Sequence, residues 1–468
     1  MLLGRTFRHH VPEPLLCRMQ IVRARVWHLL LKRCRLGHTW RMSGFLQVGS
    51  LVVAELKDGI RGELLSAFSE DMFERVTEPW DEVYDNVIVR FRAPGRHVAE
   101  RLDLMGISRA AVLALLDNSI RGTRADSILD DYEGRVFLDG QDDFSYSGEA
   151  INALLKDNDR FLRSLDAESW ILQLSSAPVD ADVKDMSPGS KGWLMRFLKG
   201  WDEIHTLRII LLAFPGAEVI LDVTDLLAGR WGQDDRKALI TKVLGVASGT
   251  ASPPLIVLTE GKTDAEFIAA AVNTLYPHLA DLIRFPDFGL KPEGGVSALV
   301  RNVRAFAAAG VANRTVAVLD NDTAGEEGFK LLGSSLPANI RVMRYPNLSL
   351  ARSYPTLGPP TLDSPHGSLA FADVNGLACS IELYLGRDVL QSEEGPLRPV
   401  QWKAYISGLR RYQGEVTGKG EIHAAFRAKV EEAQRDPRAM QRQDWEGLRM
   451  IVNEIISSFD RGIPKPGE

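Results

Sequence analysis

The chain has 468 residues, of which 45% are hydrophobic and 25% charged, and its formal net charge is −6. This composition is typical of globular proteins and argues against a disordered, collagen-like or coiled-coil chain, while ~100–200 residues per domain predicts two to four domains. The sequence has no apolar run of about 18 residues, the length that a membrane span needs. Its three cysteines are too few for a disulfide framework. We therefore expect a cytoplasmic protein without membrane association.

Residues 1–41 are strongly basic. They contain nine Lys or Arg residues and one acid, so they carry +8 while the rest of the chain carries −14. The segment lacks the long apolar run and the cleavage site of a secretory signal, and it has no serine, unlike most mitochondrial transit peptides. We expect that translation begins at Met42 and that this extension is not part of the working protein. A basic arm that binds nucleic acid is the functional alternative.

Residues 42–250 are predicted to form an α+β module. Alternating apolar and polar residues predict strands, and apolar residues at helical spacing predict helices. Ser108 is a suitable N-cap for one of these helices. The predicted strands are 50–56, 87–92 and 218–223, and the predicted helices are 97–105, 109–116, 148–165 and 191–201.

The small, proline-ended segment 247–254 predicts a domain boundary. Beyond it, short apolar runs alternate with helical segments four times, which is the pattern of an α/β domain with a parallel sheet. From 400 to 459 we expect mostly helix. The predicted strands are 255–258, 282–285, 315–319 and 340–344, and the domains are 1–41, 42–250, 251–390 and a helical C-terminal region at 391–468.

Acidic residues follow two of the predicted parallel strands. Glu260 and Asp264 come after the first strand, and Asp320 and Asp322 come after the strand 315–319. Function gathers at the carboxyl ends of parallel strands, carboxylate oxygens suit Mg²⁺, and clustered carboxylates repel one another without a cation. The pattern predicts a metal site. The alternative is that each acid stabilises the start of its own helix, which suits Asp264 and Asp322.

These motifs, EGKTD at 260–264 and DND at 320–322, resemble those of the Toprim domain, which topoisomerases, primases, RecR-like repair proteins and OLD-family nucleases share. The resemblance covers residues 254–345, and LDNDTAG is most similar to the OLD-type nucleases. It implies a Rossmann-like parallel sheet. It also implies that Glu260, Asp264, Asp320 and Asp322 hold one or two Mg²⁺ or Mn²⁺ ions, and that Glu260 also moves a proton.

Other stretches are similar to the bacterial HEPN/Toprim-associated family, which is grouped with conflict systems that attack foreign nucleic acid. This resemblance implies that Glu382, in SIELYL, completes the OLD-type metal site. The stretches are LDVTDLL (221–227), YPTLGP (354–359), ADVNGLACSIELYLG (372–386), RPVQWKAY (398–405) and YQGEV (412–416).

HEPN ribonucleases use an arginine and a histidine spaced along one helix. Arg92 and His97 have a compatible spacing, but Pro94 and Gly95 between them interrupt a helix. We therefore expect the N-terminal module to serve recognition or assembly and to have no chemistry of its own.

Several basic residues are candidates for phosphate contact. Lys262 lies between the first two acids and has a point charge suited to a phosphate. Arg301 and Arg304 are spaced i, i+3 on a predicted helix and would follow a nucleic-acid backbone. The alternative for all three is a solvated helix surface.

Residues 398–449 contain eleven basic and seven acidic residues, and aromatic side chains interleave with the basic ones. Such a pattern suits stacking on a single strand, but amphipathic helices that pack their aromatic residues inward are the commoner cause. The aromatic residues are Trp402, Tyr405 and Tyr412, and the basic candidates for nucleic-acid binding are Lys403, Arg410 and Arg411.

Together these observations predict a metal-dependent nuclease, with Glu260 and Lys262 as catalytic residues, that acts in anti-phage or other conflict defence. The expected cofactor is Mg²⁺ or Mn²⁺ and the expected partner is nucleic acid, DNA rather than RNA; a homo-oligomer stays open. The alternative is a non-catalytic, RecR-like scaffold that binds DNA or a protein partner. The overall expectation is an α/β protein with a Toprim core, an α+β N-terminal module and a helical C-terminal region.

Overall fold

The computed structural model describes residues 43–57, 60–79, 85–123, 148–177, 188–227, 253–287, 294–333, 336–359, 367–391 and 395–459. The basic extension 1–41 and most of the predicted boundary at 247–254 lie outside these residues. Within them, no helix is both long enough and apolar enough to cross a membrane.

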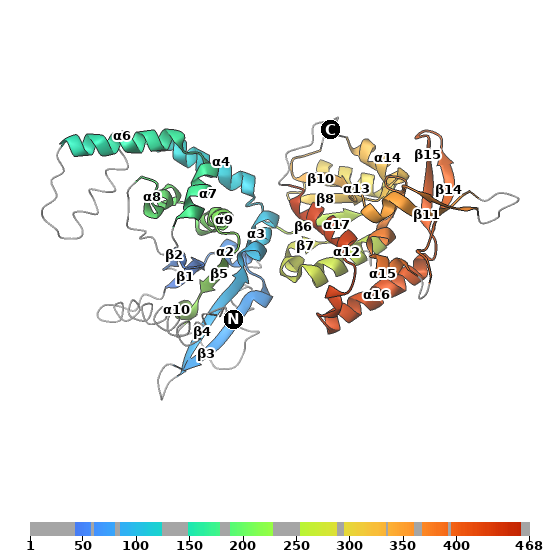
Figure 1. Cartoon of the computed structure of the whole chain (residues 1–468), viewed down its shortest axis with the longest axis horizontal. Coiled ribbons are helices and arrows are strands. Elements are labelled where there is room, and N and C mark those ends of the chain that lie inside the picture. The colour runs from blue at the N-terminus through green and yellow to red at the C-terminus, as the bar shows by residue number, and fades with distance from the viewer. Residues whose placement is uncertain are drawn as a thin grey trace, which may run out of the picture.

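The N-terminal part is built on an antiparallel sheet of five strands in the order β2-β1-β5-β4-β3 (Figure 1). Strand β5 pairs with both β1 and β4, although it lies far along the chain from both. This pairing joins the two hairpins into one sheet. The strands are β1 Gly44–Val48, β2 Leu51–Leu56, β3 Phe73–Pro79, β4 Asp85–Pro94 and β5 Glu218–Asp222.

Helices cover this sheet and bury Phe91, Trp170 and Trp193 with it in one core. Ser108 caps α4, as predicted, by accepting a hydrogen bond from the Ala111 amide at 3.3 Å. The helices are α2 Gly62–Ser66, α3 Gly95–Leu104, α4 Arg109–Gly122, α6 Gly148–Ser164, α7 Ala167–Ser176, α8 Lys191–Met195, α9 Glu203–Ala213 and α10 Thr224–Leu227.

The second part contains the predicted parallel sheet, with four strands in the order β10-β8-β6-β7. Its strands and helices alternate along the chain, which confirms the α/β fold. The strands are β6 Leu255–Thr259, β7 Ile283–Arg284, β8 Thr315–Leu319 and β10 Ile340–Arg344, and the helices between them are α12 Lys262–Leu275, α13 Val296–Ala308 and α14 Thr323–Leu332.

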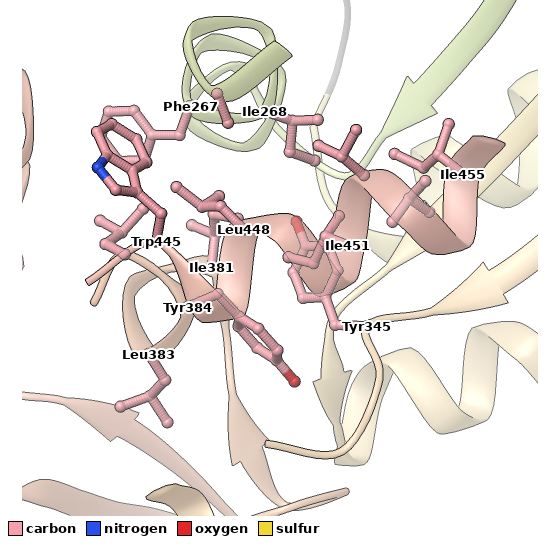
Figure 2. Packing of buried hydrophobic residues seen from close by; sticks show 14 of the residues in the cluster. Phe267, Ile268, Tyr345, Ile381, Leu383, Tyr384, Trp445, Leu448, Ile451 and Ile455 are labelled. Carbon is pink, nitrogen blue, oxygen red and sulfur yellow. The ribbon is translucent and has the colours of Figure 1, made fainter. Parts of the chain in front are cut away.

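The C-terminal helices complete the core of this part. Helix α17 (Glu446–Ser457) presents Leu448, Ile451 and Ile455 between α12 and the segments that carry Tyr345 and Tyr384 (Figure 2). The other helices here are α15 Arg387–Leu390, α16 Lys419–Arg435 and the short 3₁₀ helix η6 Ile381–Tyr384.

The expectation of helix from residue 400 onward is wrong for residues 400–416. This segment is an antiparallel hairpin of β14 (Val400–Ile406) and β15 (Arg411–Val416), and Tyr405 pairs with Tyr412 across it. The hairpin joins β11 (Tyr354–Leu357) and β12 (Leu369–Ala372) in a sheet of order β12-β11-β14-β15. The helical expectation holds only after residue 418.

Arg101 joins the two parts of the protein. This arginine of α3 is fully buried and donates to the carbonyl oxygens of Ser66, Phe68 and His278. It also forms a two-pronged ion pair with Asp281 at 2.6 and 2.9 Å. The carbonyl groups come from both parts of the chain, so the guanidinium satisfies acceptors that the junction has removed from water.

We expect Arg101→Ala to lower the free energy of unfolding by about 3 kcal/mol, because the buried carbonyl groups would lose their donor. Urea denaturation measures the change. Arg96→Ala is the matched control, since Arg96 is an exposed arginine of the same helix, and we expect a change within about 0.5 kcal/mol. Equal effects of the two substitutions would contradict the role of Arg101.

Candidate functional site

The two acidic motifs meet at one edge of the parallel sheet. Strands β6 and β8 are parallel neighbours, with Thr259 paired to Val318, so the residues that follow them emerge side by side. The Asp320 amide donates to Glu260 Oε1 at 2.9 Å, and the Gly295 amide donates to the Glu260 carbonyl at 2.7 Å. The backbone of one motif therefore holds the carboxylate of the other.

Asp322 and Asp264 flank this pair. Asp322 lies in β9 (Asn321–Asp322) and caps α14, since its Oδ1 accepts from the Gly325 amide at 2.7 Å. Asp322 therefore stabilises the start of its own helix, as the alternative interpretation predicts. Capping uses only one of its two carboxylate oxygens, so the other is available for further contacts. Asp264 lies in the first turn of α12 and accepts a hydrogen bond from the Tyr345 hydroxyl at 2.9 Å.

Glu382 is the fifth acid and reaches the site from a distant segment. Strand β13 (Ala378–Cys379) pairs with β9, which brings η6 and Glu382 alongside the DND motif. Its carboxylate accepts from the Ser380 hydroxyl at 2.5 Å, contacts His423 Nε2 at 2.9 Å and forms an ion pair with Lys419 at 3.3 Å.

Burial and mutual repulsion disfavour the charged forms of the central acids. Burial raises the pKa of Glu260 to about 7, and the charges of Asp322 and Asp264 add to the effect. The pKa of Asp320 is raised well above its usual range by burial and then by Asp264, Glu260, Asp322 and Glu382. All five carboxyl groups therefore belong to one electrostatic cluster.

The outer acids differ in how they are compensated. Burial raises the pKa of Asp264, and the hydrogen bond from Tyr345 offsets only part of that rise. Glu382 is 3% exposed; burial raises its pKa, but Lys419, Ser380 and His423 together outweigh this and lower it. Among the described residues, Glu382 is thus the one acid of the five that forms an ion pair, and Glu260 and Asp320 are half-buried.

One oxygen of this cluster has no partner among the residues that the structure describes. Asp320 Oδ1 is buried and makes no hydrogen bond to any of them, which is costly for a carboxylate. The potential metal ligands are all carboxylate oxygens, the hard ligands that Mg²⁺ prefers. No three His, Cys, Asp or Glu side chains converge on one point within the described residues. Mg²⁺ keeps most of its water and needs only one or two carboxylates beside a substrate phosphate, so the arrangement fits that ion.

The basic candidates lie around the cluster rather than in it. Lys262 begins α12, is exposed, and within the described residues forms no hydrogen bond or ion pair with the acids. Arg301 and Arg304 are exposed on α13, and Arg304 donates to the Leu331 carbonyl at 2.8 Å. Arg411 pairs with Glu326, and Lys403 pairs with Glu415 at 3.2 Å.

The Arg92 and His97 pair does not form a helical ribonuclease motif. Arg92 lies in β4, two residues before its end, and forms an ion pair with Glu218 at 2.7 Å. His97 lies on α3, which begins after Pro94, and its ring stacks on that of His278 at 4.0 Å between centroids. Both side chains serve structural contacts, as the intervening proline and glycine predict.

Gln413 of β15 is a site residue that residue-level reasoning missed. Its Nε2 donates to Asp322 Oδ2 at 2.5 Å, and its Oε1 accepts from the Ala324 amide at 3.2 Å. The amide thus fixes the carboxylate and the loop that follows it. The only sequence signal was its place in YQGEV. Tyr345, Lys419 and His423 were also missed, because each meets its acid only through the fold.

Comparison with known families assigns the N-terminal part. Residues 43–243 match the family model described as HEPN/Toprim N-terminal domain 1. This confirms the family resemblance of the N-terminal domain. The match ends before Glu260, so the Toprim domain itself is not identified by it. No curated protein and no solved structure matches the chain.

We expect Asp320→Asn to stabilise the metal-free protein by about 1–2 kcal/mol at pH 8. The raised pKa means that the folded wild type binds a proton that the unfolded chain has released, so its stability falls as pH rises above about 4. An amide does not titrate, and the gain should shrink at pH 5. Urea denaturation in EDTA at both pH values measures it.

Glu327→Gln is the matched control, because Glu327 is exposed on the neighbouring helix α14. Its effect should stay within about 0.5 kcal/mol at either pH. A loss of stability in Asp320→Asn at pH 8 would show that the carboxylate is not under electrostatic strain.

Proposed function

We propose that the protein is a metal-dependent nuclease that cleaves nucleic-acid phosphodiester bonds at the cluster of Glu260, Asp264, Asp320, Asp322 and Glu382. The observation that carries the proposal is the buried, unpartnered Oδ1 of Asp320 among four other carboxyl groups. A carboxyl group crowded by other acids, with a buried oxygen that has no donor, is explained most simply by a cation that binds there.

The residues divide into distinct roles in this proposal. Asp320 and Glu260 would hold Mg²⁺ or Mn²⁺ directly, with Asp264, Asp322 and Glu382 arranged around them. When bound, the ion would activate water and stabilise charge on the scissile phosphate. Glu260, with a pKa raised to about 7 by burial, is suited to accept or release a proton near neutral pH. Lys262, exposed at the start of α12, would contact a phosphate.

The N-terminal family match supports a role in anti-phage or other conflict defence, with DNA proposed before RNA as substrate.

The second candidate function is a scaffold that binds DNA or a protein without cutting. The capping role of Asp322 favours it, because one of the five acids already has a purely structural partner.

Cleavage assays separate the two. We expect the purified chain with Mg²⁺ or Mn²⁺ to cut at least one of single-stranded DNA, duplex DNA and RNA, and EDTA to abolish cutting. Glu260→Gln and Asp320→Asn should each lower the rate at least ~10³-fold, since metal and proton transfer depend on them, whereas Glu327→Gln should not. Absence of metal-dependent cleavage on every substrate would favour the scaffold.

Gln413 should act as a positioning residue for Asp322. We expect Gln413→Leu to lower metal-dependent cleavage about 10–100-fold, in the range for residues that orient metal ligands, and to weaken Mn²⁺ binding measured by calorimetry. Gln401→Leu is the matched control, because Gln401 donates to the Gly358 carbonyl within the same sheet. A loss of activity with unchanged Mn²⁺ affinity would contradict this role.

A further inference from the structure

The tip of the β14–β15 hairpin exposes a pair of aromatic rings. Tyr405 is 54% exposed and Tyr412 is 44% exposed, and their rings meet edge to face with centroids 5.0 Å apart. Trp402 lies beside them, 6.2 Å from Tyr412 between centroids. Tyrosine rings fixed on strands and open to water form a surface on which other flat groups can stack.

The charge around these rings favours an anionic partner. The hairpin contains three basic residues, Lys403, Arg410 and Arg411, and one acid, Glu415. The Arg410 side chain is exposed and has no ion-pair partner within the described part of the chain. Glu326 forms ion pairs with three basic residues, Arg411, Lys330 and Arg344. Positive charge is therefore also in excess around Glu326.

The hairpin is fixed against the acidic cluster. The Thr323 hydroxyl donates to the Tyr412 carbonyl at 2.9 Å, and Gln413 and Arg411 bind Asp322 and Glu326. Side chains alternate along a strand, so Arg411 and Gln413 face the cluster while Tyr412 lies on the opposite face. A chain stacked on the tyrosines would reach the acids around the hairpin tip, past Arg410 and Arg411.

We infer that this hairpin binds single-stranded nucleic acid by stacking its bases on Tyr405 and Tyr412 and leads the strand to the acidic cluster. Unpaired bases offer free faces to aromatic rings, whereas the bases of a duplex are already stacked on one another, and basic residues follow the phosphates. The inference rests on the proposed function for what happens to the strand, but the binding itself does not require cleavage.

Fluorescence anisotropy in EDTA tests binding without cutting. The probes are a fluorescein-labelled 20-nucleotide oligothymidylate, the matching oligouridylate and a 20-base-pair DNA duplex. We expect Tyr405→Ala and Tyr412→Ala each to raise the Kd for the single strands about 10-fold, the double variant to raise it about 100-fold, and duplex affinity to stay the same. Tyr412→Trp should retain binding.

Phe371→Ala is the matched control, because Phe371 is a 68% exposed aromatic residue on β12 of the same sheet. This variant should bind single strands as the wild type does.

Two outcomes would overturn the inference. One is that the double variant keeps its affinity for single strands, and the other is that its affinities for single strands and duplex fall equally. The test also distinguishes this inference from the proposed nuclease. If the tyrosine variants lose binding but the wild type never cleaves, the hairpin binds single strands and the nuclease proposal is rejected. If the wild type cleaves and the double variant cleaves equally well, the nuclease proposal stands and the stacking role of the tyrosines is rejected.

Discussion

The concentration of like charge where β6 and β8 end is the constraint on which the rest of this site depends. Because the two strands are parallel neighbours, Glu260 and Asp320 must emerge together, and the amide of Asp320 holds the carboxylate of Glu260 in place. The Glu260 carboxylate cannot turn away without breaking this backbone hydrogen bond. Burial and repulsion therefore raise the pKa values of both acids and favour their protonated forms. A bound cation would relieve the same repulsion.

The surrounding side chains contact the outer acids and leave one oxygen of Asp320 without a donor among the described residues. Tyr345 donates to Asp264, Gln413 to Asp322, and Lys419 neutralises Glu382. A cluster kept only for stability would have a donor for the buried oxygen of Asp320 as well, because an unpartnered buried carboxylate destabilises the fold. A protein that retains such an oxygen gives up stability for it, as functional sites commonly do.

The sequence is sufficient to predict that Glu260 and Asp320 lie close together, because their positions follow from local rules about strand ends. It does not predict the residues that bind the outer acids. Tyr345 is 81 residues from Asp264, and Gln413 is 91 residues from Asp322. The hairpin was misjudged for a definite reason. A bulge shifts the register of β14 between Trp402 and Ala404, so Trp402 and Tyr405 share a face at a spacing of three, which imitates a helix.

The junction with the N-terminal domain bears on the same site through one rigid element. Helix α12 carries Asp264 in its first turn, and its 14 residues span about 21 Å before the chain turns into the 3₁₀ helix η3 (Pro277–Leu282). There Arg101 of α3 binds the His278 carbonyl and Asp281. The N-terminal domain thus supports the far end of the helix that positions an acid of the cluster. Because a helix of this length resists bending, we expect a shift of that domain to be passed on through α12 to Asp264.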